Sequence, residues 1–149
     1  MIKKILYCDM DGVLVDNSSG IEKLSEEMKE KYEGRLYAAP GIYSLMKPLE
    51  GALEAFEQLS KSYDTYILST APWYNSSAWS DKHQWVKKYL GVSAKQRLIL
   101  SQHKHLNRGD YLIDDRKVNG AAEFQGEHIH FGTDKFPNWK TVLEYLDHS

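Results

Sequence analysis

The sequence predicts an α/β fold, a Rossmann-like three-layer sandwich in which a parallel sheet lies between helices. Two observations predict it. Short apolar strand candidates alternate along the chain with segments whose apolar residues recur at helical spacing. Two of the strand candidates also end abruptly in acidic residues, and side chains at the carboxyl ends of parallel strands meet at one edge of a sheet. The sequence therefore predicts a sheet with a functional site at that edge.

Each expected strand is short and rich in Ile, Leu, Val or aromatic residues. The strands are expected at Lys4–Cys8, Thr65–Ser69, Leu98–Leu100, Tyr111–Ile113 and His128–Phe131. Amphipathic helices are expected at Leu49–Ser62, Ala78–Leu90 and Trp139–Leu146, the last behind the N-cap candidate Asn138. We expect right-handed crossovers between the strands and helices on both faces of the sheet.

Residues 18–47 interrupt this alternation. They hold a polar helix candidate, Ile21–Tyr32, followed by the irregular stretch Gly34–Gly41. This pattern predicts a small helical cap inserted after the first strand, which leaves 1–17 and 48–149 as the core domain. The alternative is a surface helical hairpin with no role in substrate binding.

Composition narrows the class of protein. With 149 residues and 42% hydrophobic content, the chain is expected to form one core domain with a small insert. A formal net charge of −2 argues against a binder of long nucleic acid. No signal-peptide region or membrane-length apolar run is present, and Cys8 is the single cysteine. We therefore expect a cytoplasmic protein that does not act at a membrane, with Cys8 as a small core residue.

The first acidic pair follows the first strand. Asp9 and Asp11 are two residues apart, and Gly12 lets the chain turn. The cost of crowding two negative charges is most simply offset by a bound cation, which points to Mg²⁺. A turn without function, or a calcium loop, is the alternative explanation of this short motif.

The second acidic pair, Asp114 and Asp115, follows the strand candidate Tyr111–Ile113. Together with the first pair it completes an all-oxygen set suited to a hard cation. We expect Asp9, Asp11, Asp114 and Asp115 to form the metal site. One residue of the second pair would bind metal directly, and the other would bind through water or orient Lys82.

Two further features suit an anionic substrate. Ser69 and Thr70 end a strand at the same expected edge, where hydroxyl and backbone N–H groups could hold phosphate oxygens, although such residues often only cap the next segment. Lys82 lies near a helix N-terminus, where its charge opposes the helix dipole unless it has another task. Lys104 is a second candidate, and a solvated lysine is the alternative explanation for both.

In order along the chain, these motifs resemble those of the haloacid dehalogenase superfamily of phosphatases, and more narrowly the 5'(3')-deoxyribonucleotidase family. The resemblance covers nearly the whole chain. Its motifs are Asp9–Leu14, Ala39–Gly41, Pro48–Leu53, the strand ending in Ser69 and Thr70, Trp85–Gly91 and Leu112–Arg116.

The resemblance implies a Mg²⁺-dependent phosphomonoesterase that acts on nucleoside monophosphates through an aspartyl-phosphate. Asp9 would be the nucleophile, and Asp11 the acid and then the base. Asp11 would bind the metal through its backbone carbonyl. Ser69, Thr70 and Lys82 would hold the phosphoryl oxygens, with Lys104 as the further candidate. The sequence departs from the family pattern at two positions. Asn17 stands where family members have an aromatic residue that faces the base, and Gln102 replaces a basic residue near the phosphate.

The substrate side is less well defined by the sequence. Tyr37, Tyr43, Trp73 and Tyr74 stand in cap-side loops where a base could stack, and Tyr43 and Trp73 are the expected substrate contacts. The six histidines are dispersed and are expected to be core or surface residues rather than zinc ligands. A phosphatase of the same superfamily for another small phosphomonoester and a catalytically silent binding module are the alternatives, and oligomeric state stays open.

Overall fold

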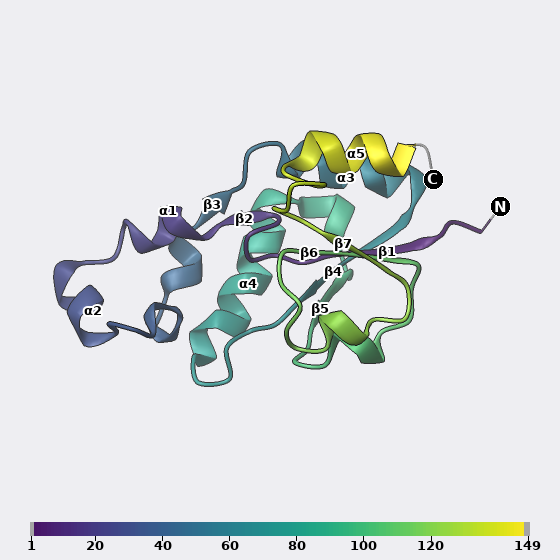
Figure 1. Ribbon diagram of the computed structural model, residues 1–149. Coiled ribbons are helices and arrows are strands. Elements are labelled where there is room, and N and C mark those ends of the chain that lie inside the picture. Colours follow the sequence, from purple (N-terminus) through teal and green to yellow (C-terminus); the bar gives the residue numbers. More distant parts are fainter. Residues whose placement is uncertain (1, 148–149) are drawn as a thin grey trace.

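A wholly parallel sheet forms the centre of the molecule (Figure 1), as the computed structural model of residues 2–147 shows. Its five strands are β1 (Ile5–Cys8), β4 (Asp64–Ser69), β5 (Leu98–Leu100), β6 (Tyr111–Asp114) and β7 (Glu127–His130). Their order is β5-β4-β1-β6-β7, and each neighbouring pair is parallel. The strand that carries the first acidic pair is thus central, between the strand that ends in Ser69 and the strand that ends in Asp114.

Three longer helices cover one face of the sheet. They are α3 (Ala52–Ser62), α4 (Ser76–Tyr89) and α5 (Trp139–Asp147). Phe56, Trp85 and Val142 from these helices join the core cluster that contains Leu6 and Ile67 of the sheet. Figure 1 shows α3 and α5 side by side along this layer. The chain moves from β1 to β4 to β5 in one direction, so right-handed crossovers place α3 and α4 on the same face.

The other face has a thinner cover. Tyr7, Leu68 and Leu112 point to it and pack with Ala121 and Phe124. The cover consists of the 3₁₀ helices η4 (Lys104–Leu106) and η5 (Ala121–Glu123), which lie in the β5–β6 and β6–β7 connections. These connections, 101–110 and 115–126, are near the minimum length for a crossover and leave no room for a full α-helix. The three-layer α/β class is confirmed, but the layer opposite α3, α4 and α5 consists of short 3₁₀ helices instead of the expected α-helices.

The segment after β1 contains the short elements of the chain. They are β2 (Val15–Asp16), α1 (Asn17–Ile21), α2 (Glu26–Lys31), η1 (Leu36–Ala38), η2 (Ile42–Leu45) and β3 (Lys47–Pro48). β2 and β3 pair antiparallel and form the base from which the segment projects beyond the sheet (Figure 1). η2 packs against α4 and α1, which attaches the segment to the core.

The single helix expected at Ile21–Tyr32 is wrong, because α1 ends at Ile21 and α2 begins only at Glu26. Ser25 separates them: its backbone is extended, and its hydroxyl accepts a hydrogen bond from the Met28 N–H at 3.2 Å. This is the geometry of a helix N-cap, so α2 begins directly after Ser25. Similarly, α3 begins at Ala52 instead of Leu49, because Gly51 takes a left-handed backbone with φ of 80°.

The other predicted elements are confirmed within one or two residues at their ends. The short η3 (Gly91–Ala94), which links α4 to β5, was not expected. The predicted capping role of Asn138 is confirmed, since its Oδ1 accepts a hydrogen bond from the Thr141 N–H at 3.0 Å. Cys8 is buried in the sheet, where burial raises the pKa of its thiol. None of the helices in residues 2–147 is both long and apolar enough to cross a membrane.

We expect Phe56→Ala to lower the free energy of unfolding by about 3–5 kcal/mol, because Phe56 is fully buried between α3 and the sheet and its loss leaves a cavity. Urea denaturation followed by circular dichroism measures the change. Glu57→Ala, one residue further on the exposed side of the same helix, is the matched control and should shift stability by about 0.5 kcal/mol or less. Equal losses in both variants would contradict this description of the core.

Candidate active site

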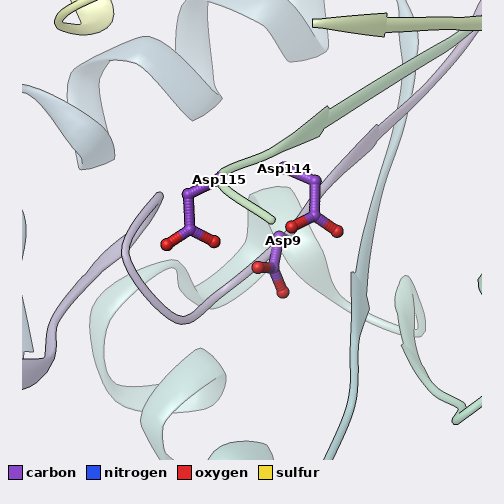
Figure 2. Close-up of side chains that lie close together, drawn as sticks. All are labelled: Asp9, Asp114 and Asp115. Atoms are coloured by element: carbon purple, nitrogen blue, oxygen red, sulfur yellow. The ribbon is translucent and has the colours of Figure 1, made fainter. Parts of the chain in front are cut away.

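The ends of β1 and β6 bring three carboxylates together. Asp9 follows β1, Asp114 ends β6, and Asp115 comes directly after it. Figure 2 shows the three side chains close together, and one oxygen from each lies within 4.8 Å of the others. Asp9 and Asp114 are buried and Asp115 is half-buried. The structure thus joins residues of both acidic pairs, as their positions at strand ends predict.

The donor set fits a hard divalent cation. All of its atoms are carboxylate oxygens, the ligands that Mg²⁺ prefers. Asp115 Oδ1 is buried and has no hydrogen-bond partner among residues 2–147, and burial raises the pKa of this carboxyl. A buried carboxylate oxygen without a partner is costly, and a bound cation would supply the missing interaction.

Gly12 allows the close approach of Asp115 to the first loop. Its φ is 74°, and a Cβ at this position would lie 2.2 Å from Asp115 Oδ2. A larger residue would therefore push Asp115 away from Asp9. The Asp11 carboxylate is not part of the three-residue cluster found among the described residues, and it binds Lys82 instead.

Lys104 provides the positive charge inside the cluster. Its Nζ lies 2.5 Å from Asp114 Oδ2 and 3.2 Å from Asp9 Oδ1, and the side chain is buried. Burial lowers the pKa of Lys104, but Asp9 and Asp114 outweigh this effect and raise it overall. Burial also raises the pKa of Asp9 well above its usual range; Lys104 opposes that shift, and Asp114 and Asp11 add to it. One ammonium therefore faces three crowded carboxyl groups.

Lys82 lies on the other side of Asp9, and its side chain is fully buried. Its Nζ lies 3.1 Å from Asp11 Oδ2 and donates hydrogen bonds to Ser69 Oγ at 2.8 Å and to the Thr70 carbonyl at 2.9 Å. Of the two roles left open for the second residue of this acidic pair, orienting Lys82 is wrong, because Lys82 contacts Asp11, Ser69 and Thr70 and the lysine beside Asp114 is Lys104. The reason is topological: α4 follows β4, so Lys82 arrives on the β4 side of β1, away from β6.

The two hydroxyl residues at the end of β4 differ in access. Ser69 is fully buried and contacts Lys82, whereas Thr70 lines the cavity above the acidic cluster. Thr70 Oγ1 donates a hydrogen bond to the Ser101 carbonyl at 2.7 Å. Gln102 also lines the cavity, and its Nε2 donates to the Ala71 carbonyl at 3.0 Å.

A cavity of about 560 Å³ opens from the acidic cluster. Tyr43, from η2, lines it and is almost fully buried; its ring stacks on Tyr37 at 6.1 Å, and its hydroxyl lies 3.4 Å from Asp11 Oδ2. The Lys82 Nζ lies 4.7 Å from the centre of the Tyr43 ring. Trp73 and Tyr74 line the mouth and are 73% and 91% exposed. The four aromatic residues singled out in the sequence therefore surround one cavity.

Two histidines of β7 were not expected at the site. His128 Nε2 lies 3.0 Å from the Asp114 carbonyl, and His130 Nε2 lies 2.9 Å from the Asp115 carbonyl. Because a carbonyl oxygen only accepts, the protonated nitrogen faces it in each case. The alternation His128–Ile129–His130 beside the acidic strand is the signal that could have suggested this, since β7 pairs with β6 at Asp114 and His130.

Comparison of the sequence with known proteins points to one family. The family model of "5' nucleotidase, deoxy (Pyrimidine), cytosolic type C protein" matches residues 18–141. The chain is 61% identical over 144 residues to a Vibrio phage KVP40 protein provisionally named a 5'(3')-deoxyribonucleotidase, covering 97% of this chain and 85% of that one. It is 31% identical to the human 5'(3')-deoxyribonucleotidase, cytosolic type, covering 83% and 77% of the two chains.

Solved structures show the same fold at low sequence identity. The HAD hydrolase YfnB from Bacillus subtilis matches with a TM-score of 0.69 at 10% identity, covering 99% of this chain and 100% of that one. The haloacid dehalogenase-like protein SP0104 from Streptococcus pneumoniae matches with a TM-score of 0.61 at 17% identity, covering 96% and 90%. The family resemblance found in the sequence is therefore confirmed: the chain has the fold of these structures and belongs to the 5'(3')-deoxyribonucleotidase family.

Proposed function

We propose that this enzyme is a Mg²⁺-dependent phosphomonoesterase that hydrolyses deoxyribonucleoside monophosphates to nucleoside and phosphate. The observation that carries the proposal is the position of Asp9, buried beside Lys104 and facing Asp114 and Asp115, with Asp11 two residues further on. The names of the relatives support the nucleotide as substrate. A cytoplasmic location is part of the proposal and is supported by the human relative, which is named as the cytosolic type.

Asp9 is the proposed nucleophile. Its Oδ1 accepts a hydrogen bond from the Met10 N–H at 2.8 Å and forms an ion pair with Lys104 Nζ at 3.2 Å, so we assign the attack on phosphorus to Oδ2. The new bond joins Oδ2 to phosphorus while the bond from phosphorus to the sugar oxygen breaks, which gives an aspartyl-phosphate. Asp9, Asp114 and Asp115 would hold Mg²⁺, which when bound offsets the charge of these carboxylates and of the phosphoryl oxygens.

Asp11 is the proposed acid and base. Lys82 and Tyr43 both contact its Oδ2, whereas Oδ1 has no hydrogen-bond partner among the described residues. In the first step Asp11 gives its proton to the departing sugar oxygen. In the second step it takes a proton from the water that attacks phosphorus, and the bond from phosphorus to Asp9 breaks to release phosphate.

We propose that the remaining polar residues hold the phosphoryl group. Thr70 lines the cavity, and the Lys82 ammonium, held by Ser69 and by the Thr70 carbonyl, lies next to it at the end of β4. Lys104 holds Asp9 and Asp114 and adds a second positive charge next to the reacting oxygens. We propose that residues 18–47 act as a cap, since Tyr43 reaches Asp11 from this segment.

The nucleophile and the metal can be tested together. Asp9→Asn should abolish phosphate release from dTMP, because the amide is a poor nucleophile and a poor cation ligand, while the circular dichroism spectrum stays unchanged. Chelation should abolish the activity of the unmodified enzyme, and added Mg²⁺ should restore it. Full turnover by Asp9→Asn would show that another group attacks phosphorus.

The substrate class follows from the aromatic walls of the cavity. The aromatic side chains offer stacking surfaces for a base, whereas a sugar phosphate has no aromatic ring to stack on them. These side chains are Tyr37, Tyr43, Trp73 and Tyr74. We expect kcat/KM for deoxyribonucleoside monophosphates to exceed that for hexose phosphates by about tenfold or more, which is about 1.4 kcal/mol of discrimination. A tenfold preference for hexose phosphates would instead favour the alternative, a phosphatase for another small phosphomonoester. No phosphate release from any substrate would favour a silent binding module.

The two roles of Asp11 can be separated with leaving groups of different basicity. Asp11→Asn removes the proton donor and keeps the shape, so transfer from a nucleotide should slow sharply because its alkoxide leaves poorly. An aryl phosphate needs less protonation, so its first step should be partly spared and phosphoenzyme should accumulate. Rapid quench with labelled substrate measures this. Equal slowing of both substrates, with no rise in phosphoenzyme, would limit Asp11 to a structural role.

A further inference from the structure

Asn75 is a buried amide in the loop between β4 and α4, and it departs from the usual role of its position. It comes directly before α4, where an Asn side chain normally caps the helix by accepting a hydrogen bond from a backbone N–H of the first turn. The Asn75 side chain makes no such bond to α4, all of whose residues the structure describes. The residue is 3% exposed, so its amide needs other partners.

Most of those partners belong to the segment after β1. Asn75 Nδ2 donates hydrogen bonds to the Tyr37 carbonyl at 2.8 Å and to the Ala39 carbonyl at 3.1 Å. Asn75 Oδ1 accepts a hydrogen bond from Ser77 Oγ at 2.6 Å, and the same Oγ accepts one from the Gly41 N–H at 2.9 Å. Both polar atoms of the amide are thus used, and three main-chain groups of that segment are bound to the start of α4.

These hydrogen bonds join the two halves of the aromatic wall of the cavity. One half is Tyr37 and Tyr43, which lie on either side of the bound stretch, and the other half is Trp73 and Tyr74, which directly precede Asn75. The two halves come from distant parts of the sequence and line the same cavity. The position of one half relative to the other therefore depends on the Asn75 amide.

A different set of contacts attaches the base of the same segment. β2 pairs with β3, and Trp85 Nε1 donates a hydrogen bond to the Met46 carbonyl at 3.0 Å. The Asn75 amide instead binds residues 37–41, whose Tyr37 lines the cavity. Loss of the Asn75 donors would therefore release the cavity wall while the base of the segment stays attached to the core.

We propose that Asn75 is a positioning residue, which holds residues 37–41 against the β4–α4 loop so that the aromatic wall is already formed when the substrate binds. The inference rests on the proposed nucleotidase function. When a wall is formed in only a fraction of the molecules, the apparent affinity for the ligand falls by that same fraction. Asn75 therefore acts on substrate affinity through the aromatic residues that it holds, and not on the reacting atoms.

Asn75→Asp tests the proposal because it keeps the shape of the side chain and removes its donor. One carboxylate oxygen still accepts from Ser77, and Asp is as favourable as Asn before a helix, but the other oxygen now faces the Tyr37 and Ala39 carbonyls. We expect KM for dTMP to rise by about tenfold or more while kcat stays within about threefold, because bound nucleotide restores the wall. Asn75→Ala, which lacks the repulsion, should raise KM by a smaller factor.

Two controls separate positioning from a general loss of activity. Inorganic phosphate fits the reacting centre and has no ring to stack on the wall, so its inhibition constant against dTMP should stay unchanged in Asn75→Asp. Ser76→Asp places the same charge one residue further on, at an exposed position in the first turn of α4 where a negative charge is favourable. This variant should leave KM for dTMP unchanged.

Hydrogen exchange measures the wall without turnover. In Asn75→Asp, peptides that cover residues 37–45 should exchange about tenfold faster or more than in the unmodified enzyme, because this stretch opens locally. Peptides from β1 and β6 should keep their protection, since the sheet does not depend on this amide. Saturating dTMP should restore most of the protection of residues 37–45.

The outcomes distinguish the two proposals. An unchanged KM for dTMP in both Asn75 variants, or a rise of the same size in Ser76→Asp, would overturn the role of Asn75 and keep the nucleotidase function. Weaker inhibition by phosphate, or loss of protection in β1 and β6 in both Asn75 variants, would also overturn it, since the reacting centre or the whole fold would then be disturbed. Absence of phosphate release from dTMP by the unmodified enzyme would overturn the proposed function and this inference with it.

Discussion

The site depends on the repulsion among three carboxylates that the sheet holds at one edge. At a separation of about 4 Å, two like charges repel by about 4 kcal/mol at an effective dielectric constant of 20. Burial adds to this cost and raises the pKa of Asp9 and Asp115. The scaffold resists the repulsion with main-chain donors, since the Met10 N–H binds Asp9 and the Arg116 N–H binds Asp114. Such a cluster is stable in its ionised form only with additional positive charge, which Lys104 supplies in part.

The handedness of the crossovers explains how two lysines reach the same edge without competing. Lys82 comes from α4 on the helical face and reaches Asp11 on the β4 side, whereas Lys104 comes from η4 on the opposite face and reaches Asp9 and Asp114. Because β1 is central, the two ammonium groups approach from different layers. Asp9 and Asp11, only two residues apart, therefore have different cations beside them. Different environments of this kind allow two neighbouring carboxyl groups to take the separate roles of nucleophile and acid that we propose.

The strands, and the acidic residues that end them, could be predicted from sequence because both follow from local patterns. Five short apolar runs defined the sheet, and the positions of Asp9 and Asp114 at strand ends followed from the same runs. The pairing of Asp114 with Lys104 could not be predicted, since it depends on which face a short connection crosses. The break at Ser25 was missed because a cap competed with continuous helical spacing. The contacts of His128 and His130 needed the β6–β7 register, which no local pattern specifies.

Chemistry and selectivity come from different parts of the chain. The groups proposed to transfer the phosphoryl group lie on the ends of β1, β4 and β6 or are buried against them, where packing fixes their positions. Other parts of the cavity wall come from Asn17, Tyr37 and Tyr43 and from the exposed Trp73 and Tyr74, all outside the sheet. Asp9 and Asp114 are held by the strands and by main-chain donors, so we expect a substitution at an exposed wall residue such as Trp73 to leave these carboxylates in place. The scaffold can therefore keep one reaction while the loops around it change its substrate, as expected when a rigid sheet positions a site and irregular segments complete it.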